Sequence, residues 1–164
     1  MRKAVKFGAG LALATALGLV CLSQETPQTA SSQDVAVIVN PKNTASSMTL
    51  AELAKIYRGE RQYWKSNLPI VVLFRNGGSY EREVFLRTVF QMTDAQYKQY
   101  WVSKVMRAEV TAPPTELFSS GMTKEGVTTI PGAIGCISAS DIRIGMKVLR
   151  INGHLPGEPG YPLH

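Results

Sequence analysis

The chain has 164 residues, and its 18 Lys and Arg against 12 Asp and Glu give a formal net charge of +6. This length is typical of one domain that buries an adequate core without disulfides or metals. The basic residues form no stripe interleaved with aromatic residues, so the composition does not indicate a nucleic-acid partner.

The N-terminus has the three parts of a secretory signal peptide. Arg2, Lys3 and Lys6 form a basic start, an apolar run over residues 8–22 follows, and a polar stretch comes next. The apolar run is shorter than the roughly 20 residues that a transmembrane helix needs. The expected organisation is a signal peptide over 1–23, a flexible leader over 24–34 and a folded domain over 35–160.

Two alternatives to simple cleavage concern the same segment. The apolar run could remain as an uncleaved anchor, and Cys21 could carry a lipid, although Val20 is a poor residue to precede a lipidated cysteine. Cleavage near Ser23 would leave Cys136 as the one cysteine of the mature chain, which excludes a disulfide framework and predicts a buried thiol. We expect a periplasmic or secreted protein.

Strands and helices alternate along the rest of the chain. The sequence predicts buried strands at VAVIV (35–39) and IVVLF (70–74), a strand within PGAIGCIS (131–138) and a last strand over 146–151. Helices are expected over 50–59, 80–90, 94–107 and 122–129, with a short helical turn near 138–141. This alternation predicts an α/β fold with a small mixed or parallel sheet.

Capping residues and apolar spacing support these helices. Thr49 with Glu52, and Thr93 with Gln96, have the spacing of capping boxes, and Gly59 can close the first helix in a left-handed conformation. The expected inward-facing residues are Leu50, Leu53, Ile56, Tyr57, Val84, Phe85, Leu86, Val89, Phe90, Tyr97, Trp101 and Val105, and both Trp64 and Trp101 are expected to be buried.

The stretch FRNGGSY (74–80) has the composition of an anion-binding turn. Arg75 ends a predicted strand and offers a fork that matches two oxygens of a phosphate or carboxylate. Gly77 and Gly78 would let the backbone approach a ligand, and Ser79 is a plausible N-cap for the next helix. The same residues also make an ordinary turn with a helix cap, so an alternative without a ligand stays open.

Three motifs in order give a resemblance to a known family. RGERQYW (58–64), RNGGS (75–79) and PGAIG (131–135) resemble motifs of the phosphate-binding, type II periplasmic substrate-binding proteins of ABC transporters, in a short single-lobe form. The resemblance covers roughly residues 35–160. The residues that match the family pattern are Ile56, Tyr57, Gly59 and Trp64, then Arg75, Gly78 and Ser79, then 131–135.

The resemblance implies one α/β lobe with a small mixed sheet flanked by helices. It implies that VAVIV and AIGCI are the strands that would join a second lobe, and that Arg75, Gly78 and Ser79 bind phosphate from one side. A second lobe would supply the other side, and only the leader precedes Val35.

Two departures from the family pattern affect this site. Gly77 replaces the family's acidic residue, which would accept the proton of a hydrogen phosphate, so phosphate is less clearly favoured over sulfate. Tyr80 and Glu81 stand where the family has small residues, and Glu81 would repel an anion if it pointed inward. Its place in the first turn of the helix is favourable to the helix dipole, and we expect that role for it.

The sequence therefore predicts a non-catalytic domain that binds phosphate or a similar oxyanion at Arg75, Gly78 and Ser79, with no cofactor. The resemblance implies a link to ABC-type phosphate uptake. A homodimer or a protein partner could complete the cleft. The alternative is an envelope protein-interaction module derived from a lobe that has lost its ligand. His154 and His164 lack ligands at metal-binding spacing, and a Cys136–His154 pair lacks an orienting third group.

Overall fold

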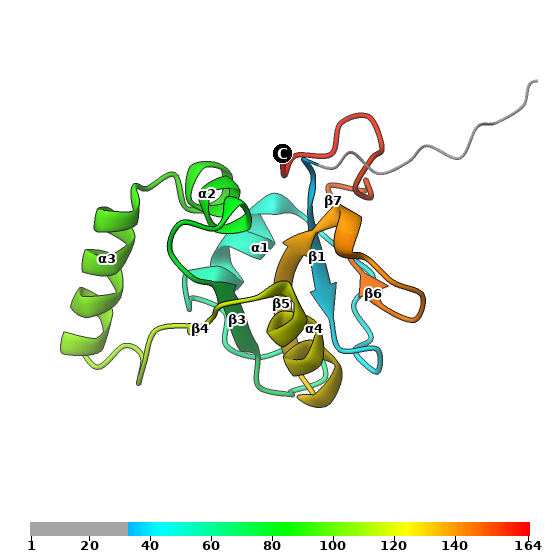
Figure 1. Cartoon of the computed structure of the whole chain (residues 1–164). Helices are drawn as coiled ribbons and strands as arrows, with labels where there is room; N and C mark the ends of the chain where they lie inside the picture. The colour runs from blue at the N-terminus through cyan, green and yellow to red at the C-terminus, as the bar shows by residue number, and fades with distance from the viewer. Residues whose placement is uncertain (1–32) are drawn as a thin grey trace, which may run out of the picture.

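A computed structural model describes residues 33–164 of the chain (Figure 1). The expected signal peptide and most of the expected leader lie outside these residues. Asp34, the last residue of the expected leader, is buried: its Oδ2 accepts a hydrogen bond from the Gly157 N–H, and its carbonyl accepts one from the Ala139 N–H. Asp34 therefore belongs to the folded domain.

The centre of the fold is a five-stranded mixed sheet with the strand order β4-β3-β5-β1-β6. β4, β3 and β5 run parallel, β1 is antiparallel to β5, and β6 is antiparallel to β1. The strands are β1 (Val35–Val39), β3 (Val71–Arg75), β4 (Thr115–Leu117), β5 (Ala133–Ser138) and β6 (Lys147–Val148). The predicted α/β class with a small mixed sheet is confirmed.

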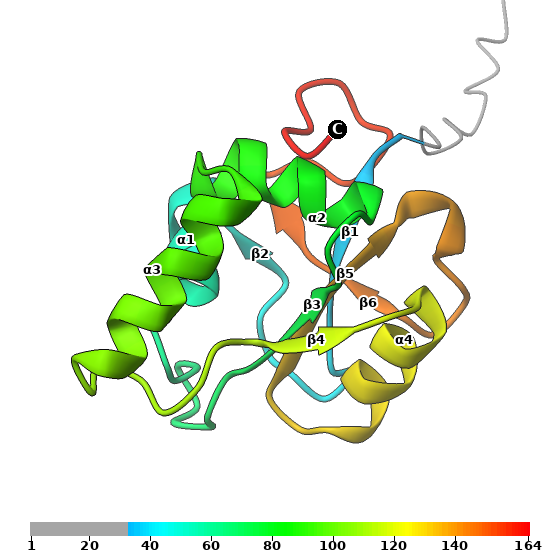
Figure 2. The same cartoon turned by 60° about the vertical axis from the view of Figure 1, so that its left-hand side comes forward.

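Helices cover both faces of this sheet, as Figure 2 shows, with α1 and α3 on one side and α4 on the other. The helical segments are α1 (Leu50–Tyr57), α2 (Tyr80–Phe85), the π-helical turn η1 (Leu86–Phe90), α3 (Asp94–Met106), α4 (Ser120–Thr129) and the 3-10 turn η2 (Ala139–Asp141). No helix in residues 33–164 is long and apolar enough to cross a membrane.

The two sheet faces form two hydrophobic clusters, and β1 supplies both because successive side chains of a strand point to opposite faces. Val35 and Val37 belong to the larger cluster with α1, α2 and α3, whereas Ala36 and Ile38 belong to the smaller cluster under α4. All five β1 residues are buried, which explains why this strand reads as a continuous apolar run.

The predicted helix caps are confirmed. Thr49 and Thr93 each form a full capping box, Ser79 caps α2, and Gly59 adopts a φ of 69° just after α1. Trp64 and Trp101 are both 5% exposed, as expected. Of the residues expected to face inward, most are buried, but Leu50 is only partly buried and Val105 is 37% exposed.

The structure differs from the predicted elements in three places. The strand expected over 146–151 is two short strands, because β6 pairs with β1 whereas β7 (Arg150–Ile151) pairs in a second small sheet with β2 (Ser47–Met48). The helix expected over 80–90 changes from α to π geometry at Leu86. The short strand β4 was not expected at all.

The C-terminal tail packs against the first strand. Tyr161 and Leu163 are buried, the Tyr161 hydroxyl donates a hydrogen bond of 2.6 Å to the Val35 carbonyl, and the Val35 N–H donates one of 2.8 Å to the Leu163 carbonyl. The Pro- and Gly-rich end of the sequence is thus part of the larger core cluster.

Candidate functional site

The RNGGS turn lies at the carboxyl end of β3. Arg75 is the last residue of this strand, and Ser79 is the N-cap of the helical segment that continues through α2 and η1. Gly78 has a φ of 83°, a conformation that favours glycine. A Cβ atom built on Gly77 or Gly78 would meet no atom within 4 Å, so the space above these glycines is open.

This turn lies where two chain connections leave the sheet in opposite directions. After β3 the chain runs into α2, which packs in the larger cluster, and after β4 it runs into α4, which packs in the smaller cluster on the other face. The Asn76 N–H donates to the Leu117 carbonyl at 3.0 Å, so the two departing loops are neighbours. In open α/β sheets, ligands bind in the crevice that such a divergence creates.

The Arg75 guanidinium is almost fully withdrawn from solvent. Its Nη1 donates to the Leu117 carbonyl at 3.2 Å, and its Nε lies 3.6 Å from Oε2 of Glu81. The two side chains are 11% and 9% exposed. Because 3.6 Å is too long for a hydrogen bond, Nε is a buried donor without a hydrogen-bond partner. Glu81 therefore points inward, toward the arginine.

The hydroxyl of Ser79 is engaged mainly in capping the N-terminus of α2. Its hydroxyl oxygen accepts a hydrogen bond of 3.3 Å from the Arg82 N–H, and the hydroxyl donates one of 3.0 Å to the Asn76 carbonyl. A hydroxyl has one donor and two acceptor positions, so Ser79 would have to release Asn76 to donate to a ligand.

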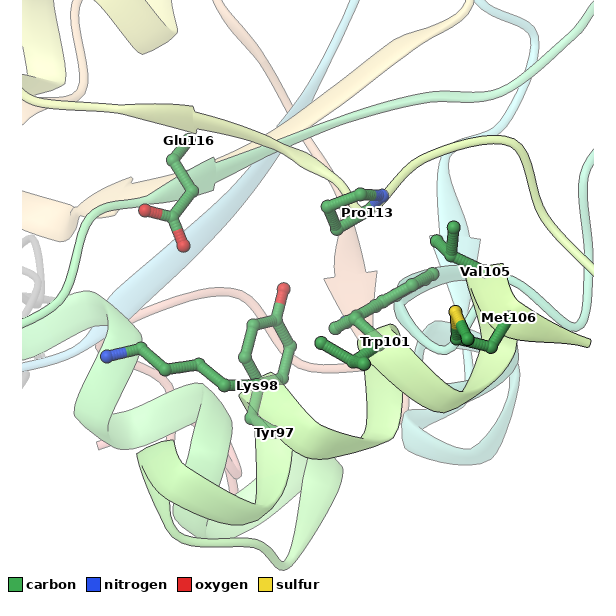
Figure 3. A pocket seen from close by; sticks show the side chains of 8 residues that line it. Tyr97, Lys98, Trp101, Val105, Met106, Pro113 and Glu116 are labelled. Atoms are coloured by element: carbon green, nitrogen blue, oxygen red, sulfur yellow. The ribbon is translucent and has the colours of Figure 1, made fainter.

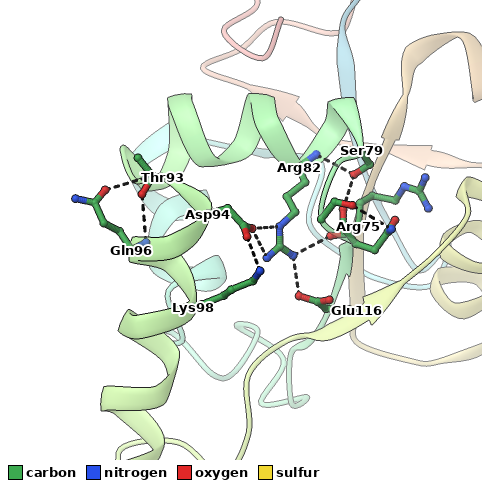
Figure 4. A network of polar contacts seen from close by, with 10 residues as sticks. Arg75, Ser79, Arg82, Thr93, Asp94, Gln96, Lys98 and Glu116 are labelled. Atoms are coloured by element: carbon green, nitrogen blue, oxygen red, sulfur yellow. Dashed lines mark hydrogen bonds and ion pairs between the residues drawn. The ribbon is translucent and has the colours of Figure 1, made fainter.

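The buried side chain of Arg82 is the centre of a polar network beside this turn, shown in Figure 4, and its two carboxylate partners are partly exposed. Its guanidinium donates hydrogen bonds of 2.8 Å to Asp94 and to Glu116, and one of 3.1 Å to the Arg75 carbonyl. It also lies over the rings of Phe74 and Tyr97. The network connects α2 with β3, β4 and the start of α3.

Each ion pair in this network stabilises the charged forms of its two partners. Burial acts to lower the pKa of Arg82, but its hydrogen bonds to Asp94 and Glu116 outweigh burial and raise that pKa. Lys98 first, and Arg82 next among the stabilising partners, hold the pKa of Asp94 below its ordinary value. Arg82 was not identified from the sequence, because its partners lie 12 and 34 residues away.

Cys136 lies in β5, the strand beside β3, and it is fully buried, as expected. Burial, and after it the charge of Glu81, raise the pKa of its thiol to about 12. The thiol is therefore neutral at physiological pH and does not suit a nucleophile. Within residues 33–164, no three His, Cys, Asp or Glu side chains gather as a metal site would require.

An apolar pocket of about 360 Å³ lies on a different part of the molecule, between α3 and the segment that leads into β4 (Figure 3). Its walls include Trp101, Val105 and Met106 on α3, with Pro113 opposite and Lys98 and Glu116 at one end. It contains neither Arg75 nor Ser79 and has no cluster of cationic groups, so it does not suit an oxyanion.

The five-stranded mixed sheet, with the RNGGS turn at the carboxyl end of a parallel strand, can now be compared with known folds. The family model described as "PBP superfamily domain" matches residues 29–150, which is more than half of the chain. The chain belongs to this family.

Solved structures of phosphate-transport proteins share the fold. A substrate-binding protein of a phosphate ABC transporter from Clostridium perfringens, with phosphate bound, is 26% identical over 75% of this chain, with a TM-score of 0.61. An ABC-type phosphate transport receptor from Vibrio cholerae is 20% identical with a TM-score of 0.60, and PstS from Borrelia burgdorferi is 21% identical with a TM-score of 0.59, each over 75% of this chain. The matches span 46%, 48% and 49% of these three proteins, so the chain corresponds to about half their length.

Proposed function

We propose that this chain is a non-catalytic oxyanion-binding lobe of the phosphate-binding type, and that Arg75, Gly78 and Ser79 form its site. The observation that carries the proposal is the position of Arg75 and the open Gly-Gly turn at the carboxyl end of β3, where two loops diverge from the sheet. The phosphate bound to the Clostridium perfringens protein supports phosphate as the ligand class.

The affinity of this site should be low for the isolated chain. A ligand at the turn is enclosed from one side only, so it remains partly hydrated and screened by salt. Arg75 also carries a resident partner, Glu81, and Ser79 has its hydroxyl proton engaged. We expect a dissociation constant on the order of 1 mM, which corresponds to about −4 kcal/mol. A second copy or another protein that supplies the missing wall would tighten it.

Replacement of Arg75 with alanine should abolish oxyanion binding, because the guanidinium is the full positive charge that this turn contributes. Isothermal titration calorimetry with phosphate, sulfate and acetate, on the wild type and on Arg75→Ala, measures this. Lys124→Ala, which removes a positive charge from α4, is the matched control and should bind as the wild type does. Equal heats from wild type and Arg75→Ala would place the site elsewhere.

We also propose that the protein acts in the periplasm or outside the cell after removal of residues 1–23. The support is the basic and apolar composition of this segment and the family to which the folded part belongs. Intact-mass measurement of protein taken from the cell envelope should show the loss of roughly 23 residues, within the usual signal length of about 15–30. Recovery of the full-length chain from the cytoplasm would contradict it.

A second candidate function is a protein-interaction module that no longer binds a ligand. It is favoured by apolar side chains near the turn: Phe118, directly after β4, is 72% exposed, and Tyr80 and Met122, in the first turns of α2 and α4, are also exposed. Exposed apolar groups of this kind mark interaction surfaces. A wild type that binds none of the three anions at millimolar concentration would favour this candidate over the first.

A further inference from the structure

We propose that Glu81 sets the affinity of the turn, because its carboxylate is the resident counter-ion of Arg75 that an incoming oxyanion must displace. This inference rests on the proposed oxyanion-binding function and concerns the same turn. It assigns to Glu81 the role of an affinity-determining residue that does not itself hold the ligand.

Arg75 and Glu81 form a close ion pair without a hydrogen bond between them. Oε2 of Glu81 lies 3.6 Å from Nε of Arg75, and both side chains are about nine-tenths buried. Burial strengthens the attraction between the two charges compared with a surface pair. Nε nevertheless has no hydrogen-bond partner. The guanidinium is thus electrically compensated while one of its donors stays unused, and a ligand oxygen at hydrogen-bonding distance could satisfy this donor.

Arg75 is the cation with which Glu81 pairs. Among residues 33–164, Glu81 forms an ion pair with Arg75 and with no other side chain. The neighbouring cation, Arg82, is already held by Asp94 and Glu116. The Cys136 thiol close to the pair is neutral and contributes no charge. Neutralising Glu81 would therefore leave Arg75 as an uncompensated, largely buried positive charge.

The position of Glu81 in the helix keeps its carboxylate at the turn. Glu81 is the second residue of α2, directly after the exposed Tyr80, and Ser79 fixes the start of the helix. An acidic residue in the first turn is stabilised by the helix dipole. An oxyanion that reaches Arg75 would therefore lie close to a carboxylate of the same sign, and the repulsion lowers affinity for every anion, whatever its shape.

The test is calorimetry with inorganic phosphate and with sulfate on Glu81→Gln, which keeps the shape of the side chain and removes its charge. We expect Glu81→Gln to bind both anions about tenfold or more tightly than the wild type, a gain of about 1.4 kcal/mol per factor of ten. The control is Glu83→Gln, which changes the net charge equally at an exposed position of the same helix and should bind within about twofold of the wild type, as expected for an exposed charge.

Two other binding results would overturn the proposal. Equal or weaker binding by Glu81→Gln means that the carboxylate does not limit affinity. Tighter sulfate but weaker phosphate binding would mean that Glu81 accepts a hydrogen bond from phosphate rather than opposing it. If Glu81→Gln does not fold by circular dichroism, Glu81→Thr replaces it under the same criteria.

The double variant Glu81→Gln, Arg75→Ala separates this inference from the proposed function. A gain that depends on Arg75 supports both. A gain that survives the loss of Arg75 refutes the proposed site. Wild-type binding that requires Arg75 but is unchanged in Glu81→Gln leaves the proposed function intact and refutes the role of Glu81.

Discussion

Arg82→Ala is expected to lower the free energy of unfolding by about 2–5 kcal/mol, the range for truncating a large buried side chain to alanine. The side chain is 1% exposed, and its loss leaves a cavity between Phe74 and Tyr97. The Arg75 carbonyl would lose a hydrogen bond, and Asp94 and Glu116 would lose a shared cation. Urea denaturation of the purified chain measures the change.

Two further variants show which part of the Arg82 side chain matters. Arg82→Met keeps most of the volume, so the difference between the methionine and alanine variants reports the packing contribution. Lys98→Ala removes the other cation that binds Asp94. Because the Lys98 side chain is 68% exposed, this variant should lower the free energy of unfolding by at most about 1 kcal/mol. A loss for Arg82→Ala no larger than that for Lys98→Ala would show that the network does not stabilise the fold.

Trp101→Ala is expected to cost about 3–5 kcal/mol, as other large-to-small core substitutions do. The indole packs edge-to-face against Tyr97 and Tyr100, and a Cβ built on Gly59 would lie 3.0 Å from the ring. Trp101 thus attaches α3 to the end of α1. Thermal or urea unfolding followed by circular dichroism measures the loss.

The control for Trp101 is its neighbour in α3. Val102 is 62% exposed, so Val102→Ala should change stability by less than about 0.5 kcal/mol, as surface substitutions usually do. Comparable losses for the two variants would mean that α3 is not attached to the body through its tryptophan.

Much of the fold could be predicted because its signals are local. VAVIV and AIGCI are apolar enough to indicate buried strands, and the capping boxes at Thr49 and Thr93 fixed the starts of two helices to the residue. The short strand β4 was missed because its sequence, TEL, has no strand signal. It is a strand through its pairing with β3, from which it is separated by about 40 residues.

The predictions for Val105 and for the last strand were wrong for a related reason. Apolar spacing placed Val105 on the inner face of α3, but this end of the helix borders the open apolar pocket of Figure 3. The run over 146–151 was read as one strand, whereas the Leu149 N–H bonds to Val37 and the Arg150 N–H to Ser46. Which partner each residue meets depends on the tertiary fold and not on the run itself.

The position of the turn could be predicted from the sequence, but the contacts between its side chains could not. Arg75 at a strand end and Ser79 at a helix start follow from local patterns, and the structure has both. That Glu81 turns inward toward Arg75 depends on the buried positions that the two side chains share at the end of the sheet. From the helix dipole, Glu81 was expected to stay in the first turn without facing the anion site, and this expectation was wrong because its carboxylate lies against Arg75.

The placement of β1 has a consequence for the order of folding. This strand is at the beginning of the described chain, yet Val35 pairs with Ser138 of β5, and its backbone and that of Leu163 are joined by a hydrogen bond. This strand, which lies between β5 and β6 in the sheet, therefore cannot complete its pairing until almost the whole chain is available. Such long-range closures make folding slow, and an unpaired apolar strand is prone to aggregate. A chain shortened at its C-terminus would leave VAVIV without part of its cover, so the last residues protect the first strand.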